Sequence, residues 1–256
     1  MELPEERFKK KPWVRRVAFW SAVVLAIVTL TGYSFRDIFK DDAKAPVSQA
    51  ATAPSSAKGV FPPQGWGPDR DMFTKEQRPT FAVLNSISNA QNYGDERNWV
   101  TAQVSSDEDW SDDVNVKPGD VVKVRFYYAN SARDDLVDSP ASWIQGARLR
   151  IRYTTGPAQT MIVQGFLSAA NAALIWDTAT VHSTADVTLS PVNGSAILSN
   201  ETFPPPAVEG LKLDAADLFS EQGGLLGDAG LDGVIKPGYK YCGAVFVDFA
   251  VEAVSS

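Results

Sequence analysis

Residues 121–128, VVKVRFYY, alternate between the two faces of an extended chain. Lys123 and Arg125 share one face, whereas the other face carries only apolar and aromatic side chains, namely Val122, Val124, Phe126 and Tyr128. A period of two residues is typical of a β-strand with one face in the core and the other in solvent. The stretch therefore predicts a half-buried strand.

Two other stretches repeat this pattern. In residues 147–153, ARLRIRY, arginines alternate with apolar residues, and in residues 244–252, AVFVDFAVE, the core face consists of Val245, Val247, Phe249 and Val251. Further strands are predicted at 81–85, 99–104, 159–168, 178–183, 186–190 and 195–199. Helical structure is limited to short turns, which we expect at 168–175 and 213–220.

Turn sequences separate these strands. Pro-Gly turns occur at 117–120 and 236–238, and an Asn-Gly turn occurs at 192–195. Proline presets the backbone of the first central turn position, and glycine accepts a positive φ. Strands at this spacing predict an all-β domain, either an antiparallel β-sandwich or a barrel, and we favour the sandwich.

An apolar stretch precedes the strands. Residues 17–35, VAFWSAVVLAIVTLTGYSF, contain no charge. A helix of this length spans about 28 Å, which is enough to cross a bilayer core of about 30 Å. Basic residues come before it, at Arg7, Lys9, Lys10, Lys11, Arg15 and Arg16. Because basic flanks stay in the cytoplasm, we expect residues 1–16 inside and residues 36–256 outside.

The alternative to an uncleaved anchor is a signal peptide, which also has a basic start and an apolar run. No small-x-small cleavage motif directly follows the run. Ala43-Lys44-Ala45 has the right form, but Pro46 follows it and charged residues separate it from the run. We therefore favour a transmembrane helix at 17–35, with the lipid bilayer as its partner. Residues 36–60, rich in Ala, Ser and Pro, then form a flexible linker to a domain at 61–256.

The charge balance limits the classes of partner. The chain carries a net charge of −7, and because residues 1–16 are basic, the part beyond the bilayer is more acidic still. This argues against nucleic acid as a partner. Cys242 is the only cysteine, so the chain has no internal disulfide and its domain must be stabilised by its core.

Four stretches combine turns and core strands: YGDERN at 93–98, WSDDVNVKPGDVVKVRFYY at 110–128, IWD at 175–177 and GLDGVIKPGYKYCGAV at 230–245. Together they resemble an uncharacterised β-rich domain of bacterial cell-surface and secreted proteins. The resemblance covers residues 61–256, which is most of the part beyond the bilayer. It implies a β-rich fold and a location outside the bacterial cytoplasm, and it implies no catalytic residues.

The arginines of the strand at 147–153 are candidates for ligand binding. Arg148, Arg150 and Arg152 lie on one face, and guanidinium groups bind phosphate and carboxylate in a fork. The stripe suits an anionic polymer of the cell envelope; the alternative is that acidic residues of neighbouring strands lie opposite it. Trp110 and Trp143 stand in polar loops and are candidate platforms for sugar rings, unless they are buried in the core.

Acidic loops provide weak candidates for calcium, which binds six to eight oxygen atoms. The candidates are Asp107, Asp109, Asp112, Asp228 and Asp232. The alternative for the stretch 107–113 is a solvated loop. In the second loop Tyr239 occupies the position where a calcium loop has its bidentate glutamate, and a turn closed by aspartate side chains explains the same residues. We therefore predict no metal and no other cofactor.

Catalytic signatures are scarce. His182 is the only histidine, and no G-x-S-x-G, phosphate-binding or dinucleotide-binding motif occurs. Asp95 and Glu96 are a carboxylate pair for a glycosidase, but adjacent side chains on a strand point apart. The simpler explanation is structural, with Arg97 paired to a carboxylate and Asp95 closing the turn.

The sequence thus predicts a non-catalytic binding or scaffolding module of the bacterial cell envelope, which contacts an envelope polymer or another exported protein. Two alternatives remain: a carbohydrate-active hydrolase that uses Asp and Glu, and a membrane-fixed subunit of a larger surface or secretion assembly. A raised pKa in one of two convergent carboxyl groups is expected of the hydrolase. A long unpaired strand edge or a large apolar patch is expected of the assembly subunit.

Overall fold

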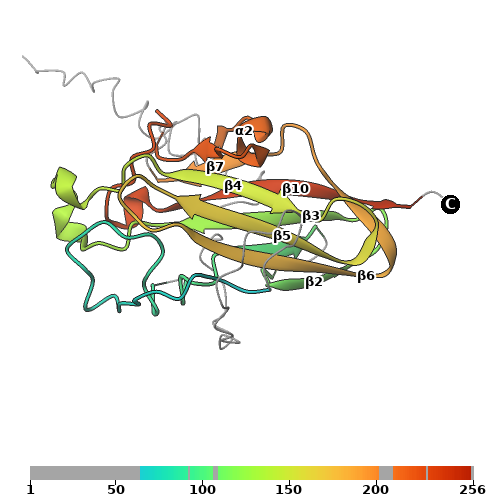
Figure 1. The fold of residues 1–256 in the computed structure, drawn as a ribbon, viewed down its shortest axis with the longest axis horizontal. Coiled ribbons are helices and arrows are strands. Elements are labelled where there is room, and N and C mark those ends of the chain that lie inside the picture. Colours follow the sequence, from blue (N-terminus) through green and yellow to red (C-terminus); the bar gives the residue numbers. More distant parts are fainter. Residues whose placement is uncertain (1–63, 92, 106–108, 202–209, 229, 255–256) are drawn as a thin grey trace, which may run out of the picture. The chain divides into compact units, whose positions relative to one another are not determined.

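Strands dominate the part of the chain that the structure, a computed structural model, describes: residues 64–91, 93–105, 109–201, 210–228 and 230–254 (Figure 1). The predicted anchor at 17–35 and linker at 36–60 lie outside these residues. Within the described ranges, no helix combines the length and the apolar character that a membrane span needs.

The strands are β1 (Val100–Val104), β2 (Asp113–Val116), β3 (Val121–Tyr128), β4 (Arg148–Tyr153), β5 (Ala158–Ser168), β6 (Ile175–Pro191), β7 (Ile197–Asn200), β8 (Leu211–Lys212), β9 (Gly224–Leu225) and β10 (Gly243–Ala253). The helical elements are short: α2 (Ala215–Phe219), and the 3₁₀ turns η2 (Asp134–Leu136), η3 (Pro140–Ser142) and η5 (Tyr239–Tyr241). Strands are therefore the main regular secondary structure of the described residues, as predicted, and helix is almost absent.

The strands form one hydrogen-bonded sheet in the order β1-β3-β10-β6-β5-β4-β9. Strand β10 lies between β3 and β6 in this order. It pairs with β3 on one side, and on the other side its first part pairs with β7 and its last part with β6. All pairs are antiparallel except β2 with β6, which is parallel.

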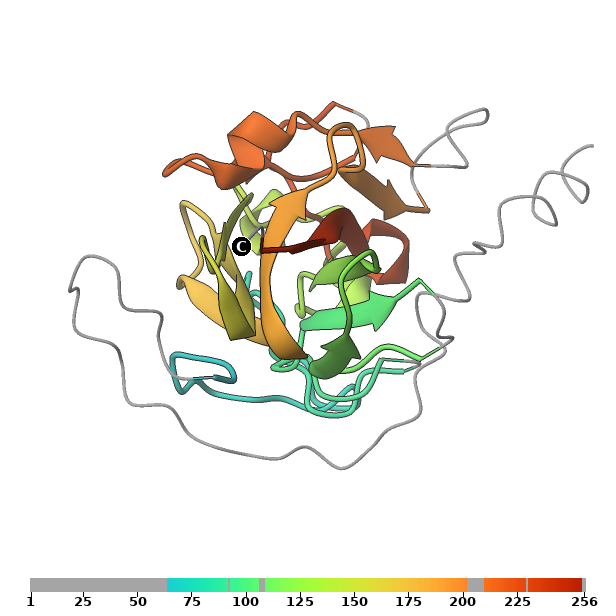
Figure 2. The same ribbon diagram turned by 90° about the vertical axis from the view of Figure 1, so that its right-hand side faces the viewer.

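Strand β6 is 17 residues long and joins two parts of this sheet. One part contains β4 and β5, and the other contains β1, β3 and β10. Its first part pairs with β5, and its last residues pair with β10. Figure 2 shows β4 and β5 in yellow on one side of β6 in orange, and β3 in green on the other side. The sequence predicts separate sheets in a sandwich. The described strands instead belong to one continuous sheet, in which β6 pairs with strands of both parts.

The core lies between these two parts of the sheet. A Cβ atom built on Gly165 of β5 would lie only 2.7 Å from the ring of Trp99 and 2.8 Å from the ring of Phe126. Glycine thus allows β5 to approach the strands of the other part closely. Trp99 is completely buried, and the single cysteine, Cys242, is buried as well.

Two predicted elements are wrong. Residues 81–85 do not form a strand, because Asn85 has a positive φ of 39° and its side-chain amide bonds the backbone of Tyr127 and Ala129 at 3.0 and 2.7 Å. Residues 169–174, between β5 and β6, form bends rather than a helical turn. The predicted strands at 178–183 and 186–190 are both parts of β6.

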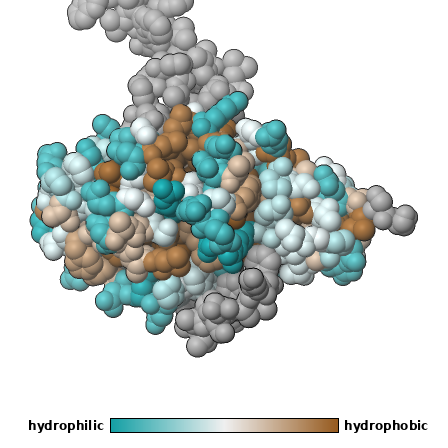
Figure 3. All heavy atoms as spheres, turned by 45° about the horizontal axis from the view of Figure 1, so that its top comes forward, coloured by the Kyte–Doolittle hydropathy of each residue, from teal (hydrophilic) through white to brown (hydrophobic). Residues whose placement is uncertain are grey.

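Large apolar side chains that remain exposed are few among the described residues: Phe81, Leu174, Val192, Tyr239 and Val254. On the face drawn in Figure 3, apolar residues (brown) form patches that hydrophilic residues (teal) interrupt. Single exposed apolar residues are normal for a protein surface.

Candidate functional site

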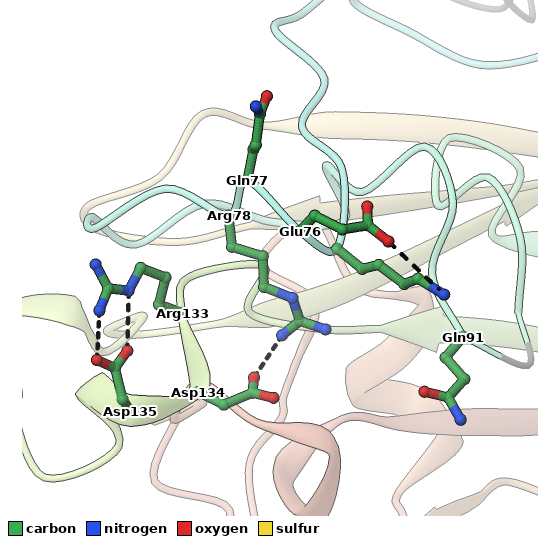
Figure 4. Close-up of a pocket in the computed structure, with 8 residues that line it drawn as sticks. Glu76, Gln77, Arg78, Gln91, Arg133, Asp134 and Asp135 are labelled. Atoms are coloured by element: carbon green, nitrogen blue, oxygen red, sulfur yellow. Dashed lines mark hydrogen bonds and ion pairs between the residues drawn. The ribbon is translucent and has the colours of Figure 1, made fainter.

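A polar cavity of about 660 Å³ lies among the loops that precede β1 and follow β3. Every residue that lines it is polar or charged: Lys75, Glu76, Gln77, Arg78, Gln91, Arg133, Asp134 and Asp135. Figure 4 shows Arg78 at the centre, with Arg133 and Asp135 on one side and Glu76 on the other. Segments more than 50 residues apart in the sequence therefore build one site.

Backbone hydrogen bonds fix the two loops to each other. The amide of Arg133 donates to the carbonyl of Pro79 at 3.0 Å, and the amide of Ser131 donates to Val83 at 2.9 Å. The rings of Phe73 and Phe81 meet edge to face with centroids 6.0 Å apart. Phe81 nevertheless keeps 55% of its surface exposed, so an aromatic side chain stands in solvent on the same loop as Arg78.

Each cation that lines the cavity meets a carboxylate. Arg78 bonds Asp134, Arg133 bonds Asp135 at 2.5 Å, and Lys75 lies 3.9 Å from Glu76. A hydrogen bond from Asn89 lowers the pKa of Glu76, and hydrogen bonds from Arg133 lower the pKa of Asp135. The lining therefore offers many donors and acceptors while its opposite charges balance.

Glu96 is a buried carboxyl group close to these loops in the sequence. It accepts hydrogen bonds from the Ile87 amide at 2.8 Å and from the Ser131 hydroxyl at 2.7 Å, and the Tyr127 hydroxyl lies at 3.3 Å. Burial raises its pKa. Glu96 thus connects the loop before β1 to the chain that follows β3, which is a structural role.

Asp177, at the start of β6, is also buried. Its carboxylate accepts the backbone amides of Trp99 and Val100 at 2.6 and 2.7 Å and that of Thr178 at 2.8 Å. Burial raises its pKa well above the ordinary value, against the opposing effect of these amides. Asp177 therefore ties β6 to the start of β1.

The turn around Asp95 has the predicted structural role. Asp95 accepts the backbone amide of Arg97 at 3.0 Å and also receives its guanidinium at 2.6 Å. The same guanidinium lies 4.6 Å from the centroid of the buried Trp66 ring. Asp95 and Glu96 therefore serve different partners and do not converge on one point.

The predicted arginine stripe lies on β4, and an acidic residue does lie against it. Arg150 bonds Glu221 at 2.6 Å and Arg152 bonds the same carboxylate at 3.1 Å. Arg148 instead donates to the carbonyl of Gly223 at 2.9 Å. An opposing carboxylate, the alternative to a ligand site, is thus present, but Glu221 belongs to the loop between α2 and β9 and not to a neighbouring strand.

The two candidate tryptophans lie elsewhere and are both half-buried. Trp110 packs on Phe246 of β10, with centroids 5.8 Å apart, and covers the guanidinium of Arg125 at 4.7 Å. Trp143 donates its indole N–H to Val137 at 2.8 Å, and the Lys236 ammonium lies 4.5 Å from its ring. Trp110, Trp143 and the arginine stripe therefore occupy separate places in the fold.

The calcium candidates close turns or face solvent. Asp228 accepts the amide of Gly230 at 3.4 Å and Asp232 accepts that of Val234 at 2.9 Å. Asp109 and Asp112 are exposed, and Asp107 lies outside the described residues. Within those residues, no three His, Cys, Asp or Glu side chains are arranged to hold a metal ion.

The cavity residues were missed by the sequence prediction. Arg78 and the Arg133-Asp134-Asp135 run are charged residues in loops, which is the ordinary composition of a solvated surface. Only the tertiary hydrogen bonds bring the two loops together.

Comparison with protein-family models, with curated proteins and with solved structures finds no match for this chain.

Proposed function

We propose that this protein is a membrane-anchored, extracytoplasmic, non-catalytic binding module of the bacterial cell envelope. Residues 17–35 cross the bilayer, residues 36–60 form the linker, and residues 61–256 form a β-sandwich in which the continuous sheet folds over its own core. The ligand is a glycan of the envelope, bound in the polar cavity.

The composition of the cavity is the observation that carries this proposal. Its volume of about 660 Å³ lies in the range of ligand sites, which is roughly 300–1,000 Å³. Sugar hydroxyls both donate and accept hydrogen bonds, and they match a lining whose charges are paired and whose remaining groups are amides. Phe81 does not line the cavity, but its exposed ring lies on the same loop as Arg78, where the apolar face of a neighbouring sugar ring can stack on it.

The states of the carboxyl groups favour binding over hydrolysis. A glycosidase needs one carboxyl group with a raised pKa beside a second carboxylate at about 5–10 Å. In the described lining, Glu76 and Asp135 have lowered pKa values. Glu96 and Asp177 have raised values, but both are buried and bond backbone amides. A lowered pKa at Glu76 and Asp135 is the opposite of what a glycosidase acid needs, and this supports binding.

The test is co-sedimentation of the full-length protein with insoluble bacterial cell-wall glycan. We expect the wild-type protein to sediment and Arg78→Gln to bind about tenfold more weakly, because hydrogen bonds from a charged donor are lost. Lys212→Gln removes one positive charge from an exposed position on β8 and should bind like the wild type. A wild-type protein that stays in the supernatant, or an Arg78→Gln variant that sediments normally, refutes the proposal.

A further inference from the structure

One carboxylate bridges two guanidinium groups on the outer surface of β4. The Oε2 atom of Glu221 lies 2.6 Å from Nη1 of Arg150 and 3.2 Å from Nη2 of Arg152. Its Oε1 atom lies 3.1 Å from the same Arg152 nitrogen. Both carboxylate oxygens are therefore engaged, and each arginine contributes a single guanidinium nitrogen to the contact.

Arg150 is the more enclosed of the two arginines, since 49% of the Arg152 side chain is exposed. Their residues alternate on β4, so both side chains stand on the same face. The guanidinium carbons lie 4.3 and 5.6 Å from the centroid of the Phe166 ring on the neighbouring strand β5. Arg150 and Phe166 are also partners in the strand register. The ring thus supports both positive groups through cation–π contact.

Glu221, in contrast, is the exchangeable part of this cluster. Its side chain is 78% exposed, whereas the Arg150 side chain is 21% exposed. Exposed ion pairs contribute little to stability because water and salt screen them. A carboxylate from another molecule can take the place of Glu221 without uncovering a buried charge.

The loop that carries Glu221 is attached to β4 on its other side. Arg148 donates to the carbonyl of Gly223, and Gly223 has a positive φ of 73° and sits so close to Leu149 that a Cβ would lie 2.6 Å from its carbonyl oxygen. Arg148 is therefore a positioning residue. It keeps the loop beside the strand, and from this loop the Glu221 side chain reaches Arg150 and Arg152.

We propose that Arg150 and Arg152 form a binding site for the carboxylate groups of an acidic polysaccharide, and that Glu221 occupies this site as a built-in competitor. The site is independent of the loop cavity. We expect a carboxylate ligand because the carboxylate of Glu221, which occupies the site in this structure, bonds both guanidinium groups. The net charge of the chain is −7, so attraction for a polyanion is local and should weaken with added salt.

The test measures binding of polygalacturonate to the immobilised full-length protein at low salt. Glu221→Gln removes the competing charge and keeps the size of the side chain. We expect this variant to bind about two- to fivefold more tightly than the wild type, the size of effect that exposed ion pairs have. Arg152→Gln should weaken binding by a similar factor, so the two substitutions in one cluster act in opposite directions.

Matched controls separate this effect from net charge. Glu252→Gln removes one negative charge at an exposed position of β10, and Lys117→Gln removes one positive charge at an exposed turn. Both should bind polygalacturonate like the wild type. Fully methyl-esterified polygalacturonate keeps the sugar chain without its charges and should not bind at this site.

The outcomes decide the proposal. It is overturned if Glu221→Gln binds no more tightly than Glu252→Gln, or if neither Glu221→Gln nor the wild type binds polygalacturonate. Polyphosphate is the second probe. Binding of polyphosphate with the expected dependence on Glu221 and Arg152, without binding of polygalacturonate, overturns the choice of an acidic polysaccharide and assigns the site to phosphate groups. Far-ultraviolet circular dichroism of each variant confirms that it is folded.

Discussion

At the scale of single residues, two buried carboxyl groups connect loops to strands through hydrogen bonds. Glu96 and Asp177 are 3% and 1% exposed, respectively, and each bonds groups from distant segments. Burying a charge is unfavourable, so burial alone raises the pKa of a carboxyl group. Their backbone partners favour the charged form, but burial is the larger cause in both residues.

The raised pKa of Glu96 predicts a specific pH dependence. Between its ordinary pKa of 4.5 and its raised value, the folded protein retains a proton that the unfolded chain releases. The stabilising contribution is therefore complete below the ordinary pKa and is lost as pH rises through the raised one, by at most about 1.4 kcal/mol per pH unit.

Glu96→Gln provides the comparison, because its amide resembles the protonated carboxyl group and does not titrate. The free energy of unfolding of the wild type, minus that of the variant, should fall as pH rises above 4.5. Urea unfolding at a series of pH values measures it. A difference that grows with pH would show that the hydrogen bonds from Ile87 and Ser131 outweigh burial.

At the scale of elements, close packing between β5 and the strands of the other part of the sheet depends on Gly165. Gly165→Ala places a methyl group 2.7 Å from Trp99 and 2.8 Å from Phe126. Both rings are buried, so they have little room to move, and such overpacking destabilises by about 1–3 kcal/mol. Thermal unfolding followed by circular dichroism should show a clearly lower midpoint.

Gly230→Ala is the matched control. The nearest atom to a Cβ at Gly230 lies 3.8 Å away, and the residue is exposed. This variant should unfold at nearly the wild-type temperature. Equal midpoints for Gly165→Ala and the wild type would contradict close packing between the two parts of the sheet.

The sequence predicted elements where the side chains alternate and failed where backbone geometry decides. Strands β3, β4 and β10 follow from their period of two. Residues 81–85 have apolar content as well, but Asn85 bonds backbone groups beside β3, and sequence patterns do not contain that tertiary contact. The union of two predicted strands into β6 was missed for a similar reason, because Thr184 and Ala185, between the two predicted strands, are not large apolar residues, whereas the backbone of β6 continues through them.

The candidate sites show the same difference between local patterns, which the sequence contains, and tertiary contacts, which it does not. The arginine stripe was found because its members lie two residues apart on one strand. The carboxylate of Glu221 was not identified as its partner, since it lies about 70 residues away. The loop cavity has no local signature at all, because Arg78 and Asp134 meet only in the folded chain.

At the scale of the whole molecule, the proposed topology predicts the result of proteolysis on intact cells. Protease should cut within residues 36–60 and remove the β-domain, while an epitope tag at the N-terminus survives. Permeabilised cells should lose the tag as well. Complete protection of the domain in intact cells, with digestion after permeabilisation, would contradict an orientation with the N-terminus inside.

The position of β10 constrains how this domain can be made. Its partners β3, β6 and β7 all come earlier in the chain, yet β10 lies between them. Strands β1 and β3, and strands β4, β5 and β6, can pair without β10, but only β10 joins β3 to β6 among the described strands. In the proposed topology, a translocation channel passes the chain unfolded, so β10 would complete the sheet on the far side of the bilayer.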